Sequence, residues 1–184
     1  MLATKQELML DRNKDIKDFV DEFTDGARNR NRYRREIEEI LKGLDSGLAL
    51  DQIRIYANRE FKPFEMEQIR LGLEHGLGEE QVKVYAKPEF SFIQMEEIRT
   101  GFEHGLTVEQ VSVYAKPEFT APAYTYECGN RNNQMKEIRL GLEHGIDSGA
   151  TTWSRENPVI YAGLDDIHTE YINQILTALR KMEK

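Results

Sequence analysis

The chain has 184 residues, of which 39% are hydrophobic and 32% are charged, and no apolar run reaches the roughly 18 residues of a membrane span. The start of the chain has no signal-peptide pattern and the single Cys128 cannot form an internal disulfide, so we expect a cytoplasmic protein. The net charge is −8, although residues 26–35 carry five arginines and no acid, and such an acidic body favours a basic partner over duplex DNA.

Residues 1–35 are predicted to form an N-terminal capping helix followed by a basic linker. Ile16, Phe19, Val20 and Phe23 follow the spacing of one helix face between residues 15 and 23. The linker contains the candidate binding residues Arg28, Arg30, Arg32, Tyr33, Arg34 and Arg35. Guanidinium groups bind phosphates bidentately and stack on bases, so RNA or single-stranded DNA is one predicted partner. The alternative is a basic linker that neighbouring acidic helices neutralise.

A tandem repeat of about 29 residues follows. Gly43, Gly72 and Gly101 are 29 residues apart, and so are Tyr56, Tyr85 and Tyr114. A period of this length is typical of a solenoid, in which each repeat buries its apolar face against its neighbours. The sequence therefore predicts an all-α fold, a short solenoid-like array of αα-hairpins with a capping helix at each end.

The first half of each repeat is predicted to be a helix. Met66, Ile69 and Leu73 lie at i, i+3 and i+7, and Gly76, Gly105 and Gly145 are expected to end three such helices in the left-handed conformation. Gly72, Gly101 and Gly141 lie inside these helices, where glycine costs about 1 kcal/mol relative to alanine. Close approach of a neighbouring helix backbone is the expected reason for them.

The second half of each repeat has two interpretations. Val82, Val84 and the intervening Lys83 alternate as in a β-strand. However, Val82 and Tyr85 also share a helix face, Thr107-x-x-Gln110 is a capping box, and Pro88 and Pro117 would end a short helix. We favour the helix.

The repeats lie near residues 36–64, 65–93, 94–133 and 134–171, and a terminal capping helix is expected at 172–182, so that residues 36–184 form the array within one compact domain. Two insertions, around residues 120–130 and 148–158, break the period. They carry Tyr124, Tyr126 and Trp153, which we interpret as candidate partner contacts because aromatic residues in loops are common contact points. The alternative is that these rings fold back onto the array.

Catalytic and metal sites are not predicted. His75, His104 and His144 lie one repeat apart, on the order of 10 Å, which is too far for the shared coordination of one metal ion. Each lies where a helix is expected to end, and contact with the negative end of the helix dipole explains it. His168 among acidic residues is a weaker metal candidate, and no nucleophile motif surrounds Cys128. We expect no cofactor and no enzymatic activity.

The repeat resembles one found in proteins of gut-dwelling anaerobic bacteria, their phages and mobile elements. The resemblance is carried by residues 94–106 with 114–119, by 65–77 with 85–90 and by 134–146, and it covers residues 36–146. A small acidic protein of this kind is similar to phage-encoded anti-CRISPR inhibitors. The resemblance implies a binding inhibitor of a host protein or nucleoprotein, such as an RNA-guided CRISPR nuclease with its guide RNA. A nucleic-acid-binding regulator that acts through residues 28–35 is the alternative.

Overall fold

The computed structural model describes residues 14–119 and 133–143, and all regular secondary structure among these residues is helical. They form eight α-helices and one short 3-10 helix, and no strand occurs among them. The predicted all-α class is therefore confirmed for this part of the chain. Two compact units are present, residues 1–76 and 77–184, and each is described by itself.

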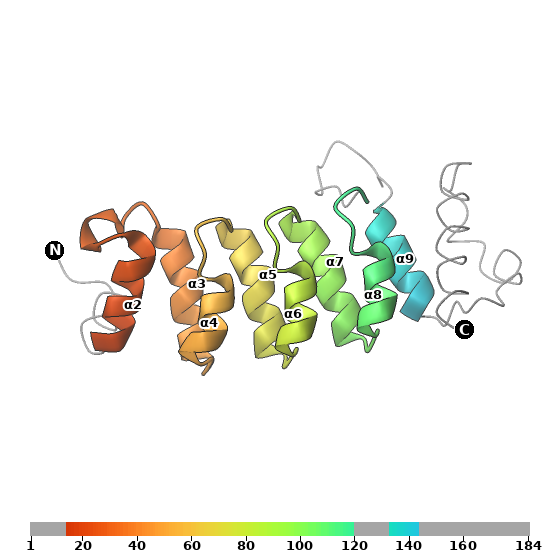
Figure 1. Cartoon of the computed structure of the whole chain (residues 1–184), viewed down its shortest axis with the longest axis horizontal. Helices are drawn as coiled ribbons and strands as arrows, with labels where there is room; N and C mark the ends of the chain where they lie inside the picture. The colour runs from red at the N-terminus through yellow and green to blue at the C-terminus, as the bar shows by residue number, and fades with distance from the viewer. Residues whose placement is uncertain (1–13, 120–132, 144–184) are drawn as a thin grey trace, which may run out of the picture. The chain divides into compact units, whose positions relative to one another are not determined.

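The first unit contains helices α2, η1, α3, α4 and α5 (Figure 1). Their bounds are Lys14–Thr24 for α2, Ala27–Asn29 for η1, Arg34–Asp45 for α3, Leu50–Tyr56 for α4 and Pro63–Glu74 for α5. α3 and α5 lie side by side, and the short α4 packs against both of them. The unit thus has a layer of long helices with a short helix on one face.

The second unit contains helices α6 to α9. Their bounds are Glu79–Tyr85 for α6, Phe92–Glu103 for α7, Val108–Tyr114 for α8 and Gln134–Glu143 for α9. α7 and α9 lie side by side, α6 and α8 pack against α7, and α8 also packs against α9. Both units therefore use the same arrangement of long and short helices.

The second half of each of the first three repeats is a helix, as predicted. α4, α6 and α8 are each seven residues long. At the start of α8, the Thr107 hydroxyl accepts from the Gln110 backbone N–H (3.3 Å) and the Gln110 side chain accepts from the Thr107 backbone N–H (2.9 Å). This capping box satisfies the backbone N–H groups of Thr107 and Gln110 at the start of the helix. The alternation of apolar and polar residues in the second half of the repeat therefore does not produce a strand.

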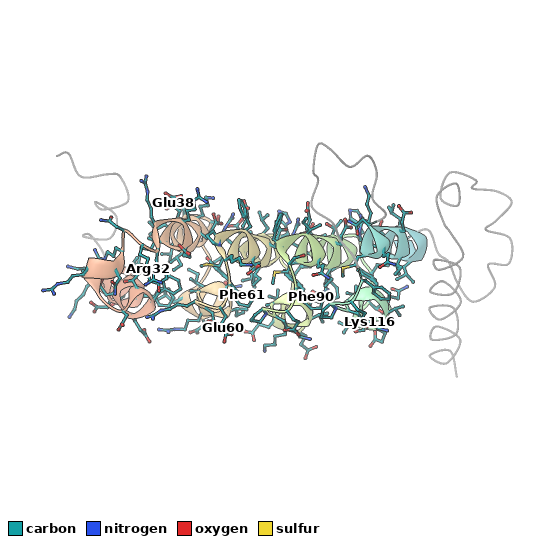
Figure 2. All side chains as sticks on the ribbon, turned by 90° about the horizontal axis from the view of Figure 1, so that it is seen from above. Arg32, Glu38, Glu60, Phe61, Phe90 and Lys116 are labelled. Carbon is teal, nitrogen blue, oxygen red and sulfur yellow. The ribbon has the colours of Figure 1, made fainter. Side chains whose placement is uncertain are left out.

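The apolar core of each unit lies between its long and short helices. In the first unit Ile40, Ile53, Met66 and Ile69 have no solvent exposure, and Phe61 lies between the two layers (Figure 2). Burial of such a side chain contributes about 1.5–3 kcal/mol, so these positions account for the period of the apolar residues. The second unit buries the equivalent set, which is Val82, Met95, Ile98 and Val111.

Glycines end the long helices in the left-handed conformation, as predicted for Gly76 and Gly105. Their φ angles are +86° and +89°, and Gly47 ends α3 with a φ of +87°. After Gly105, the Leu106 backbone N–H donates to the Gly101 carbonyl (3.0 Å), which completes a Schellman motif. Gly145 lies outside the described residues.

The glycines inside the long helices have a different cause from the one expected. A β-carbon on Gly43 would clash with the Tyr56 hydroxyl, and one on Gly101 would clash with the Tyr114 hydroxyl. Each hydroxyl donates at 3.3 Å to a carbonyl one turn earlier in the long helix, that of Glu39 or Glu97. The expectation of a neighbouring helix backbone was therefore wrong for Gly101, because a tyrosine from the short helix of the same repeat occupies the space, as it also does at Gly43.

The helix predicted between residues 15 and 23 is confirmed as α2. Phe19, Val20 and Phe23 are buried on one face, as the spacing predicted. Arg59 joins the end of α2 to the first repeat, since its Nε donates to the Phe23 carbonyl at 2.7 Å. The predicted C-terminal capping helix at 172–182 lies outside the described residues. No described helix is long and apolar enough to cross a membrane.

Candidate functional site

Buried arginines connect neighbouring long helices. In the first unit, Arg70 of α5 donates from Nε to Glu39 of α3 (3.0 Å) and from Nη1 to Glu74 of its own helix (2.7 Å). In the second unit, Arg139 of α9 makes the same two contacts, to Glu97 of α7 (2.9 Å) and to Glu143 (2.6 Å). The side chains of both arginines are less than a tenth exposed, so these charges serve packing.

The residues that end α3 and α7 also bond to these ion pairs. The Ser46 hydroxyl donates to Glu74 (2.7 Å), and His104 Nδ1 lies 2.9 Å from a carboxylate oxygen of Glu143. Burial tends to raise the pKa of Glu143, but the bonds from Arg139 and His104 outweigh it and hold this pKa below its ordinary value. The histidine thus has a specific carboxylate partner in addition to the helix dipole that the sequence suggested.

The predicted arginine run extends from η1 into the first turn of α3, so that Arg34 and Arg35 are helical and not part of a linker. Two of its members bind acidic residues within the first unit. Arg30 donates from Nε and Nη2 to one carboxylate oxygen of Asp21, at 2.8 and 2.6 Å. Arg34 lies 3.3 Å from Glu38, one turn further along α3. For Arg30, which is largely covered, the neutralised-linker interpretation fits, whereas the Arg34 side chain stays 72% exposed.

The other arginines of the run point their charge to solvent. Arg28, Arg32 and Arg35 are exposed, and none of them has a carboxylate partner among the described residues. Figure 2 shows Arg32 in the segment before α3. The Arg32 guanidinium lies 5.5 Å from the centre of the Tyr33 ring, and this ring packs edge-on against Phe23 at 5.8 Å. A fixed ring beside solvated cations is a suitable surface for an anionic partner.

Arg59 belongs to the same surface, although its place in the sequence did not indicate it. Its guanidinium lies 5.8 Å from the centre of the Tyr33 ring, on which Arg32 also lies. Arg59 occupies the position that Pro88 and Pro117 hold in the next two repeats, and this departure from the pattern is the signal that could have identified it. We call Arg28, Arg32, Tyr33, Arg34, Arg35 and Arg59 the arginine edge.

A hollow of about 450 Å³ lies beside Arg59, between α2 and the end of α4. Its walls include Phe19, Phe23 and Arg54, and Arg54 covers the Phe19 ring at 4.9 Å from its centre. Arg54 also lies 3.7 Å from Glu22. Arg54 and Arg59, which line this hollow, both contact the end of α2. We therefore interpret the hollow as part of the contact between α2 and the first repeat.

The remaining predicted contact residues cannot be placed. Tyr124, Tyr126 and Trp153 lie outside the described residues, and so do Cys128, His144 and His168. Within the described residues, no group of three or more histidine, cysteine or acidic side chains could hold a metal ion.

Comparison with known proteins gave no match. No protein-family model, no curated protein and no solved structure is similar to this chain at a significant level.

Proposed function

We propose that this chain is a non-enzymatic binding protein whose 29-residue repeats form a short solenoid-like array of αα-hairpins. Two features support the array. The long and short helices pack in the same way in both units, and the tyrosine-to-carbonyl bond of Tyr56 recurs at Tyr114. Repeat arrays of this type present many exposed positions on a regular scaffold, and they function mainly by binding.

The proposed partner is a host protein or nucleoprotein with a basic nucleic-acid channel, and an RNA-guided CRISPR nuclease is the first candidate. The observation that carries this proposal is the recurrence of exposed acids at equivalent positions of successive repeats. One set is Asp51, Glu80 and Glu109, and the other is Glu60, Glu89 and Glu118. Carboxylates in such positions can replace phosphates in a basic channel and block the nucleic acid.

Charge reversal tests this proposal. A variant with Glu60, Glu89 and Glu118 changed to lysine should lose binding to the purified nuclease and lose inhibition of DNA cleavage. The matched control changes the same residues to glutamine, which removes charge without reversing it and should give an intermediate loss. Full inhibition by the lysine variant, with an unchanged circular dichroism spectrum, would rule out channel occupation by these acids.

Direct binding of single-stranded nucleic acid is the second candidate function, and the arginine edge favours it. Replacement of Arg28, Arg32 and Arg35 by alanine should remove the binding of RNA or single-stranded DNA and reduce its dependence on salt. Arg30→Ala is the matched control, since Arg30 binds Asp21 and its loss should affect stability more than affinity. A wild-type protein with no affinity for nucleic acid at low salt would contradict this function.

A further inference from the structure

We propose that the arginine edge of one copy of this chain binds an acidic face on the second unit of another copy, so that the protein associates with itself. The acidic face consists of Glu80 and Glu109, which are the second residues of α6 and α8. The contact needs only the chain itself, so its test does not depend on either of the two candidate functions.

The cations of the arginine edge are carried by an ordered backbone. The backbone N–H groups of Asn29 and Arg32 donate to the carbonyls of Gly26 and Asn29, at 3.1 and 2.9 Å, so consecutive turns lead from η1 towards α3. Arg28, Arg32 and Arg35 on this backbone are exposed, and none has a carboxylate partner among the described residues. Binding to these side chains therefore costs less conformational entropy than binding to a flexible tail would.

The acidic face lies on two helices that pack against each other. α6 and α8 are in contact, so Glu80 and Glu109 are about one helix spacing apart, on the order of 10 Å. Both side chains are exposed. The Glu109 carboxylate accepts from its own backbone N–H and from the Thr107 hydroxyl, and these bonds hold its pKa below the ordinary value. It therefore stays ionised at neutral pH while it remains open to solvent.

The short helices of the second unit carry no cation that would cancel this face. Lys83, the basic residue of α6, pairs with Glu79 at 3.0 Å, and α8 contains no basic residue. The first unit differs in the same layer, because Arg54 lies on α4 and Arg59 follows it. The first unit thus presents exposed cations, and the second presents exposed acids. Charge complementarity favours a contact between the first unit of one copy and the second unit of another.

The contact is heterologous, since two different surfaces meet in it. A copy that uses its arginine edge still offers its acidic face to a third copy, so the assembly does not have to stop at two. Exposed ion pairs contribute little individually and are screened by salt. We therefore expect weak association that requires high protein concentration and low salt.

Self-association has a consequence for partner binding. Glu80 and Glu109 also belong to the acids that carry the proposed binding to a basic channel. Because the arginine edge of a second copy would cover them, an associated copy should bind such a partner more weakly than a free copy does. This consequence, unlike the contact itself, rests on the proposed function.

Sedimentation velocity of the full chain at micromolar to millimolar concentration measures the association. At low salt the mass of the wild type should rise above the 21.4 kDa of one chain as the concentration increases. It should return to that value at about 1 M salt, where the Debye length is about 3 Å. Glu80→Lys with Glu109→Lys should weaken the association at least about tenfold. This variant moves the net charge from −8 to −4, which by itself would reduce the repulsion between copies.

The matched control is Glu89→Lys with Glu96→Lys. It makes the same change of charge at two exposed acids outside the face, and it should associate at least as strongly as the wild type. Glu80→Gln with Glu109→Gln avoids a lysine in the first turn of either helix and should give a smaller loss of association than the lysine variant. Circular dichroism confirms that each variant is folded.

An exchange of charges tests whether the edge and the face meet. Arg28→Glu with Arg35→Glu should stay monomeric by itself. An equimolar mixture with the lysine variant of the acidic face should associate again, because an acidic edge then meets a basic face. A mixture that stays monomeric would overturn the proposal, and so would a wild type that stays monomeric at low salt. Equal losses in the lysine variant and the matched control would show that the face is not the site of contact.

Discussion

The first unit contains two groups of arginines in opposite environments. Arg70, in the interior between α3 and α5, is buried and divides its guanidinium between Glu39 and Glu74. Arg28, Arg32 and Arg35, on the arginine edge, are exposed and have no carboxylate partner within the described part of the chain. In the interior, an arginine side chain holds two neighbouring helices together. On the edge it leaves charge available to a partner.

The difference shows that arginines adjacent in the sequence need not share one structural role. The five arginines of the run are conspicuous because they are consecutive or nearly so, yet Arg30 is committed to Asp21. The structural arginines Arg70 and Arg139 are isolated in the sequence, and the first repeat has Leu41 at the equivalent position. Their role follows from burial, which removes water and leaves the carboxylates as the partners that stabilise the charge.

The largest effect is expected from removing the interior arginine. Arg70→Met should lower the free energy of unfolding by about 3 kcal/mol, because it removes the buried guanidinium that both Glu39 and Glu74 bind and leaves Glu39 with Lys42 as its partner. Arg35→Met, the matched edge variant, should change this energy by less than about 0.5 kcal/mol. Urea unfolding of both variants gives the comparison, and equal losses would remove the distinction between interior and edge.

A smaller effect is expected from the glycine that faces Tyr56. Gly43→Ala should destabilise the protein by about 1–2 kcal/mol, since the clash with the tyrosine hydroxyl exceeds the gain of about 1 kcal/mol in helix propensity. The double variant Gly43→Ala with Tyr56→Phe should lose less than the sum of the single variants, as the clashing oxygen is gone. Additive losses in a double-mutant cycle would show that the hydroxyl is not the cause.

The smallest effect concerns pH. The pKa of Glu143 is held below its ordinary value in the folded state, so its ionised form stabilises the fold above the unfolded pKa. This contribution should be lost as the pH falls through the lowered folded pKa. Glu143→Gln should therefore be less stable than wild type at neutral pH and show a shallower loss in acid. The melting temperature as a function of pH measures this, and parallel acid profiles would contradict it.

Most of the described helices could be predicted from the sequence, because each position of the repeat can be compared with the equivalent positions in the other repeats. The period located the long helices, the left-handed glycines and the capping box at Thr107, all of which depend on local chemistry. It did not explain Gly43, since the clash involves Tyr56, a residue whose partner is determined only when the hairpin closes. Arg59 was missed for the same reason, because its contacts with Phe23 and Tyr33 lie far away in the sequence.

Two hydrogen bonds of the Gln94 side chain affect how the chain tolerates insertions. The Gln94 side-chain amide donates to the Pro117 and Phe119 carbonyls, at 3.0 and 2.9 Å, so the first turn of α7 is bonded to the end of the same repeat. Together with the bond between Tyr114 and Glu97, it closes the segment 94–119 by contacts internal to it. The additional residues around 120–130 begin directly after this closed segment. A junction placed there interrupts none of these bonds, which makes it a natural point for the chain to accept new sequence, whether by evolution or by the grafting of a foreign loop.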